Sequence, residues 1–213
     1  MKTFQDDSYW INRSLQDKKM DWEQTAGTWL DGYVESKNHP HRSLIVNALQ
    51  SFLPIESILE IGCNSAPNLN LIREKVSIQD NVLFGIDVNA DAIEKAKSLL
   101  PAANFVVGNV KSIPFPDKSF DIVIADAVLI YIDSNAIGKA MHEIERVVKR
   151  GIILIEWFDK LIEGTIKDFH WARNYTKILK KVGFEVEEIK ITKDLWNSKN
   201  WIKNGRLFIA HRA

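Results

Sequence analysis

Short apolar runs alternate with stretches of helical periodicity through the middle of the chain. Five runs of strand length predict β-strands at residues 57–61, 83–87, 104–107, 120–125 and 151–156. Between them, one helical repeat follows Pro40, a second is capped by Asn89, and a third is capped by Asp133 or Ser134 and ends at Gly151. Because strands that alternate with helices pair in parallel, this pattern predicts an α/β fold with helices on both faces of a parallel sheet.

The pattern changes in the last part of the chain. A helix with Trp171 in its apolar face is predicted to end at Gly183. Two extended runs follow, residues 184–191 and 206–211, with no helix predicted between them, which is typical of a hairpin. The apolar phase slips between Val186 and Ile189, so a β-bulge is expected there.

Residues 1–38 carry many aromatic side chains in a polar background. The aromatic residues are Phe4, Tyr9, Trp10, Trp22, Trp29 and Tyr33. Asp21 and Gln24 are spaced as a capping box, which predicts a helix with Trp22, Trp29 and Tyr33 on one face. We expect most of these rings to pack the helix onto the sheet, and one or two to face a substrate pocket. Residues 1–38 are thus predicted to form a lid, and residues 39–213 the main domain.

Composition narrows the class of protein. The chain has 213 residues, of which 46% are hydrophobic, and its 28 basic side chains equal its 28 acidic ones. One domain with a full core is expected, and the absence of a net basic charge makes nucleic acid an unlikely partner. The single cysteine, Cys63, excludes an internal disulfide framework, the N-terminus lacks the apolar core of a signal peptide, and the longest apolar run is too short to span a bilayer. A cytoplasmic protein without membrane contact is predicted.

The residues around Gly62 carry the first chemical signal. An apolar strand ends at Glu60 and Ile61, and Gly62 follows where the chain turns into a helix. Glycine permits a sharp bend and a close approach of the backbone to a ligand, and a helix N-terminus attracts anions. Asp87 ends the next strand, where a carboxylate can accept both hydroxyl protons of a ribose. These features predict a nucleotide-cofactor site.

Further motifs follow in order along the chain. They are Gly108-Asn109-Val110 after the third strand, the proline-bracketed run from Ile113 to Asp121, and the segment from Ala125 to Ile132. Together with Gly62 and Asp87 they resemble the class I S-adenosylmethionine-dependent methyltransferases, of the small-molecule, type 11-like kind. The resemblance covers residues 43–156 and the terminal hairpin. It implies a Rossmann-like three-layer sandwich whose mostly parallel sheet has seven strands, including an antiparallel C-terminal hairpin strand.

The resemblance also implies a cofactor, S-adenosylmethionine, with S-adenosylhomocysteine as product, and a role for each matching residue. Glu60 would lie near the cofactor's ammonium group, and the amides after Gly62, at Cys63 and Asn64, near its carboxylate. Asp87 would hold the ribose, Val88, Asn109 and Val110 the adenine, and Ala125, Asp126 and Tyr131 the methionine end. Asn64 and Ala66 stand where the family usually has glycine, and Asn109 where it usually has an acid.

Methyl transfer is a direct displacement that depends mainly on alignment and exclusion of water. Asp126, Tyr131 and His170 are the catalytic candidates, and Glu156, His39 and His41 are further candidates for a general base, although a surface or capping role is the first expectation for each of them. Two histidines around Pro40 are too weak a signal for a metal site, so none is predicted, and the run from His39 to Arg42 is interpreted only as a possible substrate contact. A small molecule, such as a sugar or a carboxylic acid, is the expected acceptor; its identity and the oligomeric state stay open.

Two other functions remain open. A nicotinamide-dependent oxidoreductase would share the fold and the acid after the second strand, but that class needs Gly-x-Gly-x-x-Gly, of which only the first glycine, Gly62, is present. A methyltransferase-like binding module without turnover is the second alternative, and Asn64, Ala66 and Asn109 are the residues that motivate it.

Overall fold

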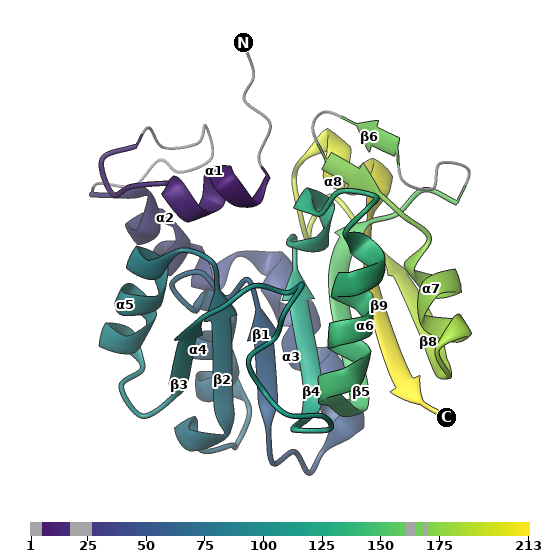
Figure 1. The fold of residues 1–213 in the computed structure, drawn as a ribbon, viewed down its shortest axis with the longest axis horizontal. Coiled ribbons are helices and arrows are strands. Elements are labelled where there is room, and N and C mark those ends of the chain that lie inside the picture. Colours follow the sequence, from purple (N-terminus) through teal and green to yellow (C-terminus); the bar gives the residue numbers. More distant parts are fainter. Residues whose placement is uncertain (1–5, 18–26, 161–164, 168–169) are drawn as a thin grey trace.

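A seven-stranded sheet with helices on both faces forms the centre of the computed structural model, which describes residues 6–17, 27–160, 165–167 and 170–213 (Figure 1). The strand order is β3-β2-β1-β4-β5-β9-β8, and only the pairs β5–β9 and β8–β9 are antiparallel. These strands are β1 (Ile58–Ile61), β2 (Leu83–Asp87), β3 (Asn104–Val107), β4 (Phe120–Asp126), β5 (Val148–Trp157), β8 (Phe184–Lys190) and β9 (Gly205–Arg212). The predicted Rossmann-like sandwich with a C-terminal antiparallel hairpin is confirmed.

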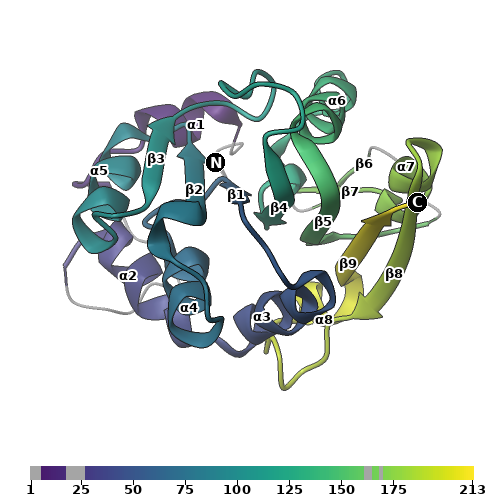
Figure 2. The same ribbon diagram turned by 90° about the horizontal axis from the view of Figure 1, so that it is seen from below.

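Eight helices are described, of which five cover the two faces of the sheet (Figure 2). They are α1 (Asp7–Asn12), α2 (Trp29–Glu35), α3 (Ser43–Leu49), α4 (Pro67–Lys75), α5 (Ala90–Leu99), α6 (Ile137–Val147), α7 (Tyr175–Lys181) and α8 (Lys199–Asn204). The short 3₁₀ turns are η1 (Ser36–Asn38), η2 (Pro40–Arg42), η3 (Gln50–Phe52), η4 (Asp80–Val82) and η5 (Leu129–Tyr131), and β6 (Thr165–Lys167) pairs with β7 (His170–Ala172) in a second sheet. Alternate residues of β4 and β5 pack into two apolar layers, one with α3, α4 and α5 and the other with α6 and α7.

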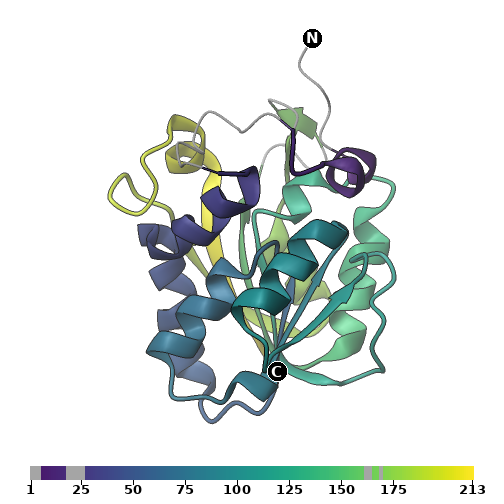
Figure 3. The same cartoon turned by 90° about the vertical axis from the view of Figure 1, so that its left-hand side faces the viewer.

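The order of the strands fixes where a ligand can bind. The order in which strands are added to the sheet reverses between β1 and β4, since β2 and β3 follow on one side of β1 and β4 then lies on its other side, parallel to it. In open α/β sheets, ligands bind beyond the carboxyl ends of the strands at such a switch point. The N-terminal helices α1 and α2 and the C-terminal helix α8 lie at this end of the sheet (Figure 3).

Two predictions near β5 are wrong. Helix α6 ends at Val147 and its N-cap is Ala136, while Asp133 accepts hydrogen bonds from two amides in the turn before it. Gly151 lies inside β5 and does not cap the helix. A Cβ at Gly151 would lie 2.1 Å from Cε1 of Phe52, so this glycine makes room for an aromatic ring of η3.

The C-terminal region differs from its prediction at three points. Trp171 belongs to β7, and α7 begins only at Tyr175, with Asn174 as its cap. Helix α8 lies between β8 and β9, where no helix was expected. The pairing of β8 with β9 is regular, without a bulge, because Val186 and Ile189 pack on opposite faces of this edge strand. The irregular pairing falls in β4 instead, between Phe120 and Ile122.

The N-terminal prediction is tested only in part. Asp21, Trp22 and Gln24 lie outside the described residues, as does Phe4. Helix α2 begins at Trp29, after Thr28, whose amide and hydroxyl both donate to Asp31 Oδ2. Trp29 and Leu30 are completely buried and pack against Ala92 of α5. Trp29 thus packs as expected, but onto α5 and not onto the sheet. The other described rings, Tyr9, Trp10 and Tyr33, line a cavity, which is more than the one or two expected, and the lid role of residues 1–38 stays a prediction.

Candidate functional site

A cavity of about 1590 Å³ opens at the carboxyl ends of β1, β2 and β4. It is larger than the roughly 300–1,000 Å³ of most small-molecule pockets, so it has room for two ligands side by side. One part, the carboxyl-edge half, is formed by residues at strand ends and in the turns after them. These residues are Glu60, Gly62, Cys63, Asn64, Asp87, Val88, Asn109, Val110 and Asp126.

The turn after β1 adopts a left-handed backbone at three positions. Gly62 has φ +63°, and a Cβ there would lie 2.4 Å from Cγ2 of Val128. Asn64 and Ala66 have φ values of 50° and 60°. Asparagine tolerates this conformation, whereas alanine pays roughly 1–2 kcal/mol for it. The methyl group of Ala66 is fully buried in the apolar layer, which offsets that cost. The turn therefore has a glycine-like shape at two positions that are not glycine.

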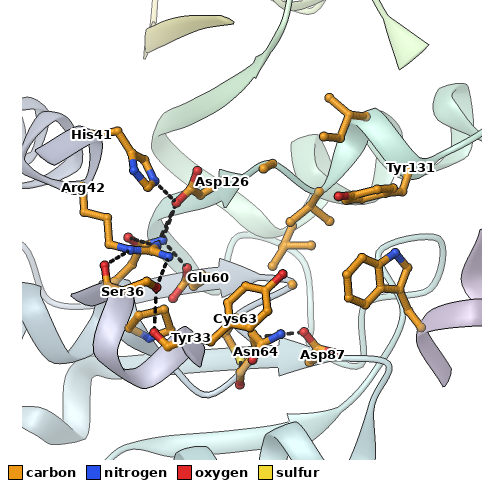
Figure 4. A pocket seen from close by; sticks show the side chains of 18 of the residues that line it. Tyr33, Ser36, His41, Arg42, Glu60, Cys63, Asn64, Asp87, Asp126 and Tyr131 are labelled. Carbon is orange, nitrogen blue, oxygen red and sulfur yellow. Dashed lines mark hydrogen bonds and ion pairs between the residues drawn. The ribbon is translucent and has the colours of Figure 1, made fainter. Parts of the chain in front are cut away.

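Asp87 ties this turn to the end of β2. Its Oδ2 accepts from the backbone amide of Asn64 at 2.9 Å (Figure 4), and its Oδ1 accepts from the amide of Asn89 at 2.9 Å. Burial raises the pKa of this carboxyl, and the backbone hydrogen bonds oppose that shift. A carboxylate offers about four acceptor positions, so two remain after these bonds. Asp87 lines the cavity, as the sequence predicted.

A buried polar network joins β1 to β4. Asp126 Oδ2 accepts from Arg42 Nη1 at 2.9 Å, His41 Nε2 at 3.0 Å and Asn68 Nδ2 at 3.0 Å (Figure 4). Asn68 Nδ2 also donates to Glu60 Oε1 at 2.7 Å. Burial alone would raise the pKa of Asp126, but His41 and Arg42 outweigh it and hold that pKa well below its usual range. Burial raises the pKa of Glu60 to about 8.

Each carboxyl group of this network keeps one oxygen without a partner. Glu60 Oε2 and Asp126 Oδ1 are buried and accept no hydrogen bond from any described residue. A buried acceptor without a donor costs free energy, roughly 1–3 kcal/mol. Both residues line the cavity, so a ligand with several N–H donors would remove this cost. The arrangement suits an ammonium group.

The sequence did not predict the contacts of Arg42 and Asn68 with Asp126. Arg42 was expected only as part of a run that could contact substrate, not as a partner of Asp126, and Asn68, in the first turn of α4, was not predicted at all. Nothing in either neighbourhood signals that the two side chains meet Asp126 of β4. Only the fold brings them together.

The remaining predicted residues fall in different places. Val88, Asn109 and Val110 line the cavity, whereas Ala125 is completely buried in the apolar layer with α6 and does not line it. Glu156 is also completely buried, and it accepts from the amides of Val128, Leu129 and Ile130. Because these three bonds occupy it in the turn before and within η5, the interpretation of Glu156 as a general base is wrong.

Helix α1 lies over the carboxyl-edge half. Asp7 accepts from Asn109 Nδ2 at 2.8 Å and forms an ion pair with Lys111. Asn89 Nδ2 donates to the carbonyl oxygens of Trp10 and Arg13 at 2.9 and 2.8 Å. These contacts fasten the N-terminal segment beside Asn109, one of the residues predicted for the cofactor.

The other part of the cavity, the aromatic half, comes from segments far apart in the chain. It consists of His39, Tyr131, Trp157, His170, Trp196 and Trp201. Trp196 stacks on Trp201 with ring centroids 3.8 Å apart, and His170 lies 4.8 Å from Trp157 and 5.1 Å from Tyr131. Tyr131 and His170, two of the predicted catalytic residues, thus lie together on this wall.

The fold, the strand order and the cavity at the switch point define a Rossmann-like cofactor-binding protein. Residues 59–155 match the family model described as methyltransferase domain. This match covers slightly less than half of the chain, and over these residues the chain is similar to methyltransferase domains.

The chain is similar to several known proteins. It is 28% identical over 143 residues to the ubiquinone/menaquinone biosynthesis C-methyltransferase UbiE of Stenotrophomonas maltophilia, covering 61% of this chain and 53% of that protein. It is 25% identical over 138 residues to trans-aconitate 2-methyltransferase of Agrobacterium fabrum, covering 62% and 50%. The chain spans about half the length of the curated relatives it matches.

Solved structures agree on the fold. The magnesium protoporphyrin IX methyltransferase of Synechocystis with bound S-adenosylhomocysteine has a TM-score of 0.63 at 15% identity, covering 90% of this chain and 91% of that one. At this identity, the likeness shows the fold alone. No described helix of the present chain is both long and apolar enough to cross a membrane.

Proposed function

We propose that this protein transfers a methyl group from S-adenosylmethionine to a small molecule. The observation that carries the proposal is Glu60 Oε2, a buried acceptor without a partner that faces the cavity at the carboxyl end of β1. The ammonium group of the cofactor would satisfy it. Asp87 has acceptor positions left for the two ribose hydroxyls, and the residues of the carboxyl-edge half therefore fit this cofactor.

When bound, the cofactor supplies an electrophilic methyl group for direct displacement. The protein's own residues have to hold the acceptor in line and keep water out. Asp126 and Arg42 form a buried ion pair in the wall of the cavity, so they hold the geometry of that wall. Tyr131, whose pKa burial raises, keeps its hydroxyl proton at neutral pH and can donate a hydrogen bond there.

The lining of the cavity favours an uncharged, ring-containing acceptor. Arg42 is the only lysine or arginine among the described lining residues, and four of its N–H groups already donate to Ser36, Asn68 and Asp126. No free cation is thus offered to a carboxylate or a phosphate. The stacked rings of the aromatic half suit a planar partner. This argues against the carboxylic acid considered from sequence.

The left-handed backbone at Asn64 and Ala66 supports a working cofactor turn, against the alternative of a binding module that has lost its cofactor. We also propose that the protein acts in the cytoplasm, which agrees with the buried free thiol of Cys63.

Incubation with S-adenosylmethionine carrying a tritiated methyl group and a pooled low-molecular-weight cell extract tests the proposal. We expect the label to appear in a small molecule with the wild-type protein and to be lost with Asp87→Ala. Asp91→Ala, an exposed acid on α5, serves as the matched control and should stay active. Binding of the cofactor without any labelled product would favour the binding module instead.

A further inference from the structure

His39 and His41 connect Asp126 of β4 to the cavity wall. The two histidines flank Pro40 at the junction of η1 and η2, and their Nδ1 atoms lie 2.5 Å apart. The other ring nitrogen of His41, Nε2, lies 3.0 Å from Asp126 Oδ2 (Figure 4). His41 is buried, whereas His39 is half-buried and lines the cavity. The three side chains therefore form one continuous chain of polar contacts.

The chemistry of each contact fixes the position of each proton. Asp126 is a carboxylate, since Arg42 and Asn68 also donate to it, so its contact with His41 uses a proton on Nε2. Burial lowers the pKa of His41, which leaves a neutral ring with a lone pair on Nδ1. The short contact between the two Nδ1 atoms then requires the proton on His39 Nδ1. His39 Nε2 is left with a lone pair.

We propose that His39 Nε2 is the general base of the methyl transfer and that the acceptor atom is a hydroxyl oxygen. His41 and Asp126 are positioning residues that hold His39 in the tautomer it needs. The acceptor oxygen gains the methyl group, the donor's sulfur keeps the electron pair of the broken carbon–sulfur bond, and the hydroxyl proton moves to His39 Nε2. This inference rests on the proposed function, but its first test does not need turnover.

The surroundings of His39 keep its lone pair free. The titratable and charged groups that act on it are His41, Arg42 and Asp126, and the ring of Trp196 lies 5.3 Å from its own. Burial, and next His41 and Arg42, lower the pKa of His39 to about 4, while Asp126 acts in the opposite direction. His39 is thus unprotonated above about pH 5. A base of such low pKa is weak, so we expect a contribution near the lower end of the usual 10²–10⁴-fold.

The tautomers can be read directly by nuclear magnetic resonance. Long-range ¹H–¹⁵N spectra of the ligand-free protein, labelled at its 5 histidines, resolve the two ring nitrogens of each residue. At pH 7 we expect the proton of His39 on Nδ1 and that of His41 on Nε2. His39→Gln and His41→Gln assign the signals, and His142→Gln, on the exposed face of α6, is the control. A proton on His39 Nε2, or on both nitrogens of either ring, would overturn the proposal.

The rate of methyl transfer then distinguishes a general base at His39 from a residue that only packs there. In the tritiated-methyl assay with pooled extract, His39→Gln should lower the transfer rate about 100-fold and leave the affinity for S-adenosylhomocysteine within about twofold. At saturating S-adenosylmethionine, where protonation of Glu60 no longer limits cofactor binding, wild-type activity should stay level from pH 7 down to pH 5. An unchanged rate in His39→Gln contradicts the role of His39 while the proposed function stands. Absence of transfer by the wild-type protein contradicts the proposed function, and the tautomers still decide the inference.

Discussion

The two halves of the cavity are built in opposite ways. The carboxyl-edge half takes its acids from the ends of adjacent parallel strands: Glu60 from β1, Asp87 from β2 and Asp126 from β4. The aromatic half gathers rings from η5, β5, β7 and the segment before β9, and adds His39 from before the first strand. The carboxyl-edge half is polar, and its carboxylates accept hydrogen bonds from backbone amides. The aromatic half consists of rings that pack and stack on one another.

This difference determines which ligand can be inferred from each half of the cavity. Strand ends have to meet at one edge of a parallel sheet, so residues there are placed by the fold itself. The rings of the aromatic half are placed by loops and short helices, which vary more freely among proteins that share a fold. The carboxyl-edge half therefore indicates the class of cofactor, and the aromatic half indicates the chemistry of the acceptor.

The largest effect is expected where the two halves meet, at the buried pair of Arg42 and Asp126. Arg42→Met leaves the Asp126 carboxylate buried with one charged partner fewer, and the free energy of unfolding should fall by about 3–5 kcal/mol. Urea unfolding followed by circular dichroism measures it. Arg73→Met, a partly exposed arginine on α4, is the control. A decrease in the free energy of unfolding of less than about 1 kcal/mol would contradict a structural role for the ion pair of Arg42 and Asp126.

The next effect concerns the cofactor and should appear in the carboxyl-edge half alone. Asp87→Ala removes charge-assisted hydrogen bonds to the ribose, each contributing roughly 1.5–3 kcal/mol, so the affinity for S-adenosylhomocysteine should fall at least about tenfold. Calorimetric titration measures it, beside Asp91→Ala. Equal affinities of the two variants would remove Asp87 from the site. A thermal melt of Asp87→Ala separates lost contacts from lost folding.

A pH effect distinguishes Glu60 from the other acids. Its pKa is about 8 in the folded protein and 4.5 ordinarily, so the folded state binds the extra proton, and this contribution to stability declines as pH rises from about 4.5 through 8. Glu60→Gln should remove that slope. Binding of the cofactor's ammonium needs the carboxylate and should release a proton near pH 7. Titrations in buffers of different ionisation enthalpy count this proton; its persistence in Glu60→Gln would assign it elsewhere.

The smallest effect is expected at the cover formed by α1. Asp7 and Lys111 are partly exposed, and such ion pairs contribute about 0–1 kcal/mol. Asp7→Ala frees Asn109 Nδ2 without moving the acids at the strand ends, so the affinity for S-adenosylhomocysteine should change less than about threefold. A loss as large as that of Asp87→Ala would make α1 part of the cofactor site itself.

Much of the carboxyl-edge half could be predicted because its signals are local. The ends of β2 and β3 agree with the sequence, and Gly62 and Asp87 are in place as expected. Predictions failed where long-range packing decides. Gly151 was predicted as a cap, although its lack of a side chain accommodates Phe52. Glu156 has the capping role that was the first expectation for it, but the sequence did not show that it accepts from the amides before and within η5. Neither partner lies near in sequence.

The arrangement of the aromatic half could not be predicted from the sequence. Trp196 and Trp201 carry no local motif, and their stacking needs α8, which was not predicted. The pair His39 and His41 was noticed, but its link to Asp126 depends on how η2 meets β4. Asn68, in the first turn of α4, gave no signal that it bridges Glu60 and Asp126.

Calorimetric titration of the wild-type protein with S-adenosylhomocysteine tests the central claim, that the carboxyl-edge half holds this cofactor. We predict binding with one-to-one stoichiometry and displacement by S-adenosylmethionine. Absence of binding at millimolar S-adenosylhomocysteine, together with binding of a nicotinamide dinucleotide, would contradict the account.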